Sequence, residues 1–188
     1  MIRTQKFISA LAYAPTILST RYVDDCLSQN RRLDPALYLL DDTEFEESSG
    51  FTISESLERA QANQKQLLRG YVIYCTEDIH GGYDTYNAIA VVNGGKCIPY
   101  RARPGASQVL RAKSAEDGSD TESKPADIYL LTGTTPHEAK LWPKFTQMVE
   151  AHGKIPRVVR YDWLLFTALS QKYVGCDGFA LTENDVDD

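Results

Sequence analysis

The sequence predicts an α/β fold in which short buried strands alternate with amphipathic helices. Helical patterns separate several apolar runs that are rich in β-branched and aromatic residues, and glycine or proline marks most junctions. A strand, a helix and a second strand follow one another between residues 71 and 100, which is the start of a βαβ unit with parallel strands. The runs expected to form strands are YVIYC, KCIPY, DIYLL and RVV.

The second half of the chain carries the clearest helix boundaries. A helix is expected from about residue 84 to 92, and Asn93, Gly94 and Gly95 end it before the next strand. The segment YDWLLFTALSQ at 161–171 is a final amphipathic helix. The predicted order is therefore strand, helix, strand, strand, helix, strand, helix.

Between the third and fourth strands the sequence predicts a helix that proline interrupts. Thr135 and Glu138 form a capping box, with Pro136 at the first helical position. Pro143 must kink or divide the helix because it lacks a backbone N–H, and Gly153 ends it.

The first thirty residues predict a helix, a short buried strand and a second helix. The first helix covers residues 4–13 with Thr4 as N-cap and an apolar face of Phe7, Ile8 and Leu11, and Pro15 ends it. The strand is expected at 16–18, and Ser19 or Thr20 would cap the second helix. The expected inward face of that second helix is Tyr22, Val23, Cys26 and Leu27.

A polar connector is expected next, with the acidic run DDTEFEE and a leucine-rich stretch at 37–40 through which it docks. Thr52 and Glu55 then form a capping box, and good helix formers continue to about Leu68, so a linker helix is expected there.

Composition excludes several functional classes. The formal net charge of the 188 residues is −6 and the sequence pI is about 5.1, which disfavours direct binding to nucleic acid. No apolar run is long enough for a transmembrane helix, so a soluble intracellular protein is expected. The four cysteines have no CxxC spacing and no nearby histidine, so we expect reduced thiols, no metal and no cofactor.

The residues from LLRGYVIYC onward resemble a complete BRCT repeat. The NGGK turn, DIYLL and above all RVVRYDWLLFTAL carry this resemblance, and Gly94, Gly95 and Trp163 match the hallmark Gly-Gly turn and tryptophan of the family. The resemblance implies a four-stranded parallel sheet flanked by helices. Because the capped linker helix joins two such units, the chain is similar to the C-terminal BRCT pair of fungal multi-BRCT genome-stability scaffolds that bind a phosphorylated histone tail.

The resemblance also implies the domain organisation. Residues 1–40 are expected to be the C-terminal part of a first repeat that is N-terminally incomplete, with Tyr22 in place of the hallmark tryptophan. A linker with its helix follows at 41–68. The second repeat is expected at 69–182, with a long mobile loop at about 101–126, and an acidic tail at 183–188.

RTQKF at the start of the chain is similar to the Arg-Thr-x-Lys motif of phosphopeptide-binding tandem BRCT proteins. The family implies that Lys6 contacts the phosphate, that Thr4 caps the helix and assists, and that Arg3 lies near the free carboxylate of a histone-type tail. A lysine supplies a point charge for a phosphate and an arginine a planar fork for a carboxylate.

The function implied is that of a non-enzymatic, nuclear scaffold in the response to DNA damage. Its expected partner is a phosphorylated histone tail or another phosphoprotein, with chromatin reached indirectly and with no direct contact to nucleic acid or membrane.

Alternatives remain open at this point. The family's phosphate pocket also uses a Ser or Thr hydroxyl and a Gly amide from the first strand and loop of repeat one, and this sequence begins after that strand. The chain is therefore either a fragment or has lost phosphate recognition. A constitutive, phosphate-independent interaction module is the main rival, and a small hydrolase that uses Cys75 with His80 is third.

Overall fold

A parallel sheet forms the centre of the region that was expected to be the second repeat. The structure, a computed structural model, describes residues 4–101 and 127–186. The sheet has the strand order β2-β1-β3-β4 and all three strand pairs are parallel. The strands are β1 (Val72–Thr76), β2 (Lys96–Tyr100), β3 (Asp127–Thr132) and β4 (Ile155–Arg160). The four-stranded parallel sheet is thus confirmed.

Helices precede the sheet and cover both of its faces. The four helices before the sheet are α1 (Gln5–Leu11), α2 (Arg21–Ser28), α3 (Thr43–Ser49) and α4 (Ile53–Asn63). The later ones are α5 (Tyr83–Val92), α7 (Pro136–Ala139), α8 (Trp142–Glu150) and α9 (Asp162–Ser170). Two short 3₁₀ helices are η1 (Pro35–Tyr38) and η2 (Glu183–Asp185). Within the described ranges, no helix is long and apolar enough to span a membrane.

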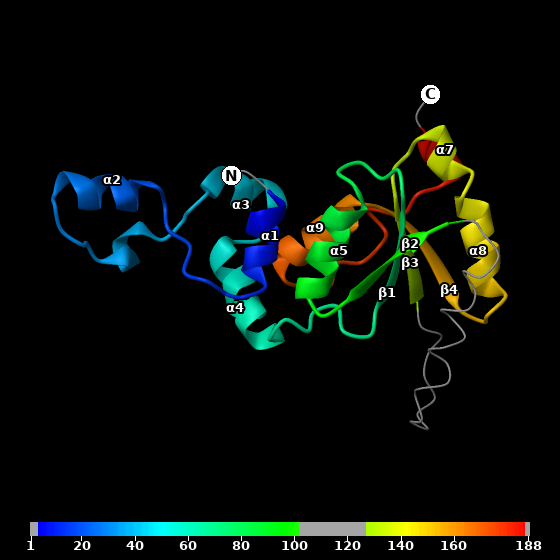
Figure 1. Cartoon of the computed structure of the whole chain (residues 1–188), viewed down its shortest axis with the longest axis horizontal. Coiled ribbons are helices and arrows are strands. Elements are labelled where there is room, and N and C mark those ends of the chain that lie inside the picture. Colours follow the sequence, from blue (N-terminus) through cyan, green and yellow to red (C-terminus); the bar gives the residue numbers. More distant parts are fainter. Residues whose placement is uncertain (1–3, 102–126, 187–188) are drawn as a thin grey trace, which may run out of the picture.

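The sheet separates two hydrophobic clusters. Alternate side chains of β1 point to opposite faces, so that Ile73 and Cys75 belong to one cluster while Val72 and Tyr74 belong to the other. Helices α5 and α9 cover the first face, and α8 covers the second (Figure 1). The first cluster also takes in residues of α1, which therefore packs on the outer side of α5 and α9.

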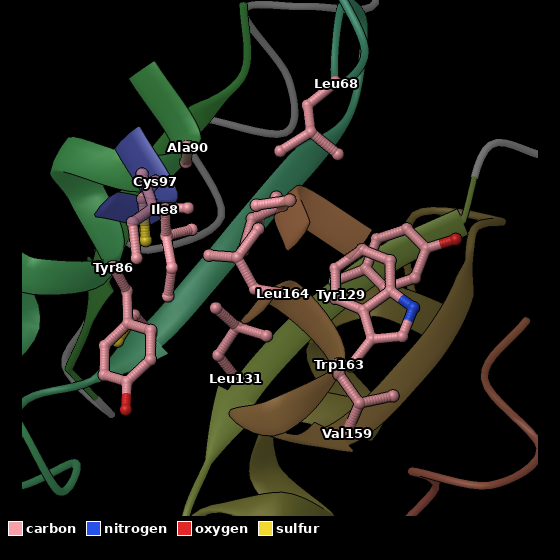
Figure 2. Packing of buried hydrophobic residues seen from close by; sticks show 14 of the residues in the cluster. Ile8, Leu68, Tyr86, Ala90, Cys97, Tyr129, Leu131, Val159, Trp163 and Leu164 are labelled. Carbon is pink, nitrogen blue, oxygen red and sulfur yellow. The ribbon is translucent and has the colours of Figure 1, made fainter. Parts of the chain in front are cut away.

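Trp163 is the largest side chain in the first cluster. It is completely buried, and its indole stacks on the ring of Tyr129 with a centroid separation of 4.5 Å (Figure 2). Its Nε1–H donates to the carbonyl oxygen of Val174 at 2.8 Å, so the one polar atom of the indole is satisfied. Trp163 thereby joins α9, β3 and the segment after α9.

Most of the local expectations for the second half and the linker are confirmed. Thr52 and Glu55 form a complete capping box at the start of α4, although α4 ends at Asn63 and not at Leu68. Thr135 caps α7, and Pro143 lies in the first turn of α8, so the expected single helix is divided in two.

The acidic run differs from its prediction. Residues 43–49 were expected to be a connector, but they form α3, with Asp42 as N-cap and Gly50 in the left-handed conformation after the last turn. Phe45 supplies the driving force, since it is 6% exposed and packs edge-on against Phe51.

The predicted strand and buried helix at residues 16–28 are wrong. The strand is reduced to one isolated bridge between Leu18 and Leu39, and α2 has no buried residue. Tyr22 and Cys26 are half-buried against the η1 segment, whereas Val23 is 57% and Leu27 75% exposed. The reason is that no strand of the described sheet lies beside α2, which extends to one end of the molecule (Figure 1).

The Gly-Gly turn after α5 is shaped by the chain that crosses it. Gly94 has φ +81°, and a Cβ there would lie 2.5 Å from the carbonyl oxygen of Lys65. A Cβ on Gly95 would lie 2.8 Å from the Cβ of Leu68. Both glycines are therefore needed for the linker to pass close to the turn, where the Leu68 N–H donates to the Asn93 carbonyl at 2.8 Å.

We expect Gly94→Ala to destabilise the fold more than Gly50→Ala. Both positions have positive φ, which costs an alanine about 1 kcal/mol, but a Cβ on Gly50 meets no atom within 4 Å. The clash at Gly94 adds roughly 1–3 kcal/mol. Urea denaturation of the two variants measures the difference. Equal losses in the free energy of unfolding would contradict the close contact between Gly94 and the linker at Lys65.

Candidate functional site

The proposed phosphate-binding residues lie in the first turn of α1. Thr4 has extended backbone angles (φ −72°, ψ 152°), and its Oγ1 accepts a hydrogen bond from the Phe7 N–H at 3.3 Å. Thr4 is therefore the N-cap, as its position in the motif predicts. Lys6 is exposed and makes no ion pair with another described residue. Arg3 lies outside the described residues.

The apolar face of α1 fixes the helix on the second-repeat region. Ile8 is 1% and Leu11 2% exposed, and both belong to the cluster that contains Trp163. The helix contacts α5, α9 and α4. Since these contacts occupy the opposite side of the helix from Lys6, the lysine is directed to solvent from a firmly packed element.

A hollow lies between α1 and α9. It has a volume of about 120 Å³ and is lined by Ile8, Asp162, Leu165, Phe166 and Leu169. Its walls are apolar except for Asp162, whose carboxylate accepts from the Arg160 Nε–H at 2.8 Å. The hollow thus lies between the first helix of the described chain and the last α-helix of the second-repeat region.

The linker helix α4 is joined to the end of α9 by side-chain hydrogen bonds. Arg59 donates to the carbonyl of Ser170 at 3.1 Å, and Asn63 donates to the carbonyl of Gln171 at 2.8 Å. These carbonyls lie at the end of α9, where the helix supplies no partner for them. The two donors therefore hold α4 against α9. They also position the segment after α4, which passes the Gly-Gly turn.

A buried amide pair extends this connection to the Gly-Gly turn. Gln171 is 2% exposed, and its Nε2 donates to the Oδ1 of Asn93 at 2.9 Å, while the Asn93 amide donates to the carbonyl of Ile89. Reasoning from sequence missed these residues. Long-range amide pairs leave no periodic signal, and only the position of Asn93 before two glycines marked it as special.

The cysteine hydrolase hypothesis is not supported by the surroundings of Cys75. Its side chain is completely buried, and its thiol donates to the carbonyl of Thr76 at 3.4 Å. A hydrogen bond with Cys97 and burial both raise the pKa of Cys75, so the thiolate that a nucleophile requires is disfavoured. All four cysteines are free, and the described ranges contain no cluster of three or more potential metal ligands.

Comparison with known proteins identifies the class. The sequence model of the family described as the Regulator of Ty1 transposition protein 107 BRCT domain matches residues 1–40. The chain superposes on the BRCT5-BRCT6 domains of Schizosaccharomyces pombe Brc1 with a TM-score of 0.71, at 24% identity, over 97% of this chain and 79% of that one. The chain thus has the tandem BRCT fold, and its first 40 residues match a BRCT family model.

Among BRCT proteins the chain is similar to the fungal genome-stability scaffolds. It is 29% identical over 177 residues to the BRCT-containing protein 1 of S. pombe, which covers 92% of this chain and 19% of that protein. It superposes on Rtt107p from its complex with a phosphorylated histone with a TM-score of 0.63, at 17% identity, over 95% of this chain and 71% of that one.

Another relative belongs to an animal. The human Mediator of DNA damage checkpoint protein 1 is 31% identical over 150 residues, which cover 73% of this chain and 7% of that protein. The chain spans a fifth or less of the length of these curated relatives.

We expect Ile8→Ala to lower the free energy of unfolding by about 2–5 kcal/mol, because it removes a buried side chain between α1 and α9. Val23→Ala on α2, the next helix along the chain, is the control. It should lower the free energy of unfolding by less than about 0.5 kcal/mol because Val23 is exposed. Urea denaturation measures both. A large loss for Val23→Ala would mean that α2 is buried in solution.

Proposed function

We propose that the chain is a phosphopeptide-binding scaffold module of the DNA damage response that recognises a phosphoserine near a free C-terminus, as in a histone tail. The observation that carries the proposal is the exposed first turn of α1, where Thr4 is the N-cap and Lys6 faces solvent. This turn lies within the segment that matches the BRCT-domain family of a protein whose structure is known in complex with a phosphorylated histone.

Lys6 supplies the principal charge for the phosphate in this proposal. Helix α1 has only seven residues, so its dipole is small and the side chain must provide most of the attraction. A lysine is well suited because its ammonium carries three donors on a flexible stem. A hydrogen bond between charged groups contributes about 1.5–3 kcal/mol.

Thr4 can serve the helix and the ligand at the same time. Its Oγ1 uses a lone pair to accept from the Phe7 N–H, which leaves the hydroxyl proton available for a phosphate oxygen. Arg3, one residue earlier, would present its planar guanidinium to the terminal carboxylate of the peptide. The residues after the phosphoserine would then run in the groove between the two repeats.

The setting proposed for this activity is the nucleus, with chromatin reached through the histone tail. A net charge of −6 makes the DNA backbone an unsuitable ligand, whereas a compact cationic site can still select a phosphopeptide. The module would act by binding alone, and catalysis is assigned to none of its residues.

The alternative is a constitutive, phosphate-independent interaction module. The observation that favours it is the set of exposed apolar side chains on α2 and the η1 segment, which could form a contact with another protein. The set comprises Val23, Leu27, Leu37 and Leu39. The two functions differ in phosphate dependence, because only the first is abolished when the ligand is dephosphorylated.

Lys6→Ala should weaken binding of a phosphoserine histone-tail peptide with a free C-terminus by at least about tenfold, since a charged hydrogen bond is lost. Fluorescence anisotropy with the phosphorylated and unphosphorylated peptides measures the effect. Lys144→Ala is the matched control, because Lys144 is an exposed lysine on α8 and far from α1 in the fold. Equal affinity for both peptides would favour the constitutive module.

A chimaera should show how much of the binding comes from the turn with Thr4 and Lys6 and how much from the first strand and loop of the family's pocket. It carries the first strand and loop of BRCT5 from the S. pombe relative ahead of Arg3. We expect tighter binding than for the chain itself, because the family's hydroxyl and glycine amide are then also available to the phosphate. If neither protein binds the phosphopeptide, the proposed function is wrong.

A further inference from the structure

The crevice at the carboxyl ends of β1 and β3 lies where ligands bind in many open parallel sheets. The chain leaves β1 toward β2 on one side, and it leaves β3 toward β4 on the other, so the connections diverge between these two central strands. Such a switch point leaves a crevice beyond the strand ends. Here Thr76 ends β1 and Gly133 follows β3.

The carboxylate of Glu138 fills this crevice. The side chain is 1% exposed although it comes from the short helix α7. Its Oε1 accepts from the Thr76 Oγ1–H at 2.7 Å and from the Gly133 N–H at 2.8 Å, and its Oε2 accepts from the Thr135 Oγ1–H at 2.8 Å. We call these three donors, Thr76, Gly133 and Thr135, the oxyanion site.

The carboxylate is held by neutral donors alone within the described part of the chain, where no salt bridge to Glu138 is formed. The adjacent His137 is turned outward and pairs with Asp78 at 3.0 Å. A buried carboxylate is costly unless hydrogen bonds satisfy it, and two hydroxyls and a backbone N–H do so here. The same kinds of donor hold phosphate oxygens in proteins.

Gly133 shows how closely the site fits its occupant. A Cβ at this position would lie 2.5 Å from Oε2 of Glu138, so only glycine lets the backbone approach the carboxylate this closely. The donors come from the ends of two strands and from the loop between β3 and α7. The site is therefore built by the sheet and its loops, and the four-residue helix α7 contributes only the occupant.

The start of α7 repeats the geometry at the start of α1, with opposite charge. Thr135 accepts from the Glu138 N–H at 3.3 Å just as Thr4 accepts from the Phe7 N–H at 3.3 Å. By this alignment Lys6 corresponds to His137 and Phe7 to Glu138. The first turn of α1 thus has a cation and no carboxylate, whereas the first turn of α7 has a buried carboxylate.

We propose that Glu138 is a built-in anion that occupies the oxyanion site of the second repeat, so that this repeat is closed to phosphate and other small oxyanions. The inference goes beyond the proposed function and does not depend on it, because it concerns only the second repeat. It predicts that removal of the carboxylate leaves a vacant site with affinity for formate, acetate or phosphate.

The test is chemical rescue of Glu138→Ala in the full chain. We expect the variant to melt at a lower temperature than the parent protein, and sodium formate, acetate or phosphate to raise its Tm in a saturable way relative to sodium chloride at equal ionic strength. The parent protein should show only the non-saturating rise in Tm that excluded salts such as phosphate give to proteins in general. Comparison of the three anions then reports the size of oxyanion that the site admits.

Two controls separate a site from a general salt effect. Glu150→Ala removes an exposed glutamate of α8 and should respond to the anions as the parent protein does. Glu138→Gln retains an oxygen that can accept from Thr76 and Gly133 and leaves no void, so it should show no rescue.

The proposal would be overturned if the anions changed the Tm of Glu138→Ala no more than they change the Tm of Glu150→Ala. If Glu138→Ala is unfolded in chloride, rescue is scored as the appearance of a cooperative melting transition on addition of formate. Its absence, together with normal folding of Glu138→Gln, would also overturn the proposal. Because no phosphopeptide is used, these outcomes leave the proposed function of α1 untouched.

Discussion

The packing of α1 against α5 and α9 is the contact on which the candidate site depends. Ile8 and Leu11 are almost fully buried in the cluster that also contains Trp163, so the first unit is attached to the second through the core and not through a flexible tether. A lysine on a loop would lose conformational entropy on binding a ligand, but Lys6 stands on an element that is already fixed. The fold thus places the positive charge of Lys6 on a fixed helix where the two units meet.

The linker makes this arrangement specific. Arg59 and Asn63 of α4 hydrogen-bond the last carbonyls of α9, and the chain then crosses Gly94, where no Cβ can be accommodated. Hydrophobic contact alone tolerates sliding of one helix over another, whereas hydrogen bonds to particular carbonyls do not. The apolar face of α1 therefore supplies the stability of the junction, and the polar contacts of α4 set its register.

The sequence predicted what depends on local pattern. Strands and capping boxes were found because apolar runs and residues such as Thr52 and Glu55 act over a few positions. The burial of α2 was predicted wrongly, because an amphipathic pattern shows which face can be buried but not whether a partner is present. Lys6 was proposed through its motif, and its role stays a prediction. Gln171 and Glu138 were not assigned their roles, because their partners lie far away in the sequence or belong to other elements.

The two threonine-capped turns have the same backbone geometry but carry opposite charges. Thr4 and Thr135 have the same geometry, yet an exposed lysine follows the first and a buried carboxylate follows the second. A pocket with unpaired donors at the centre of a fold is unstable, because buried N–H and O–H groups need partners. Glu138 satisfies such donors from within the fold. In the two proposals, Lys6 is the part of this pattern that is open to an external anion.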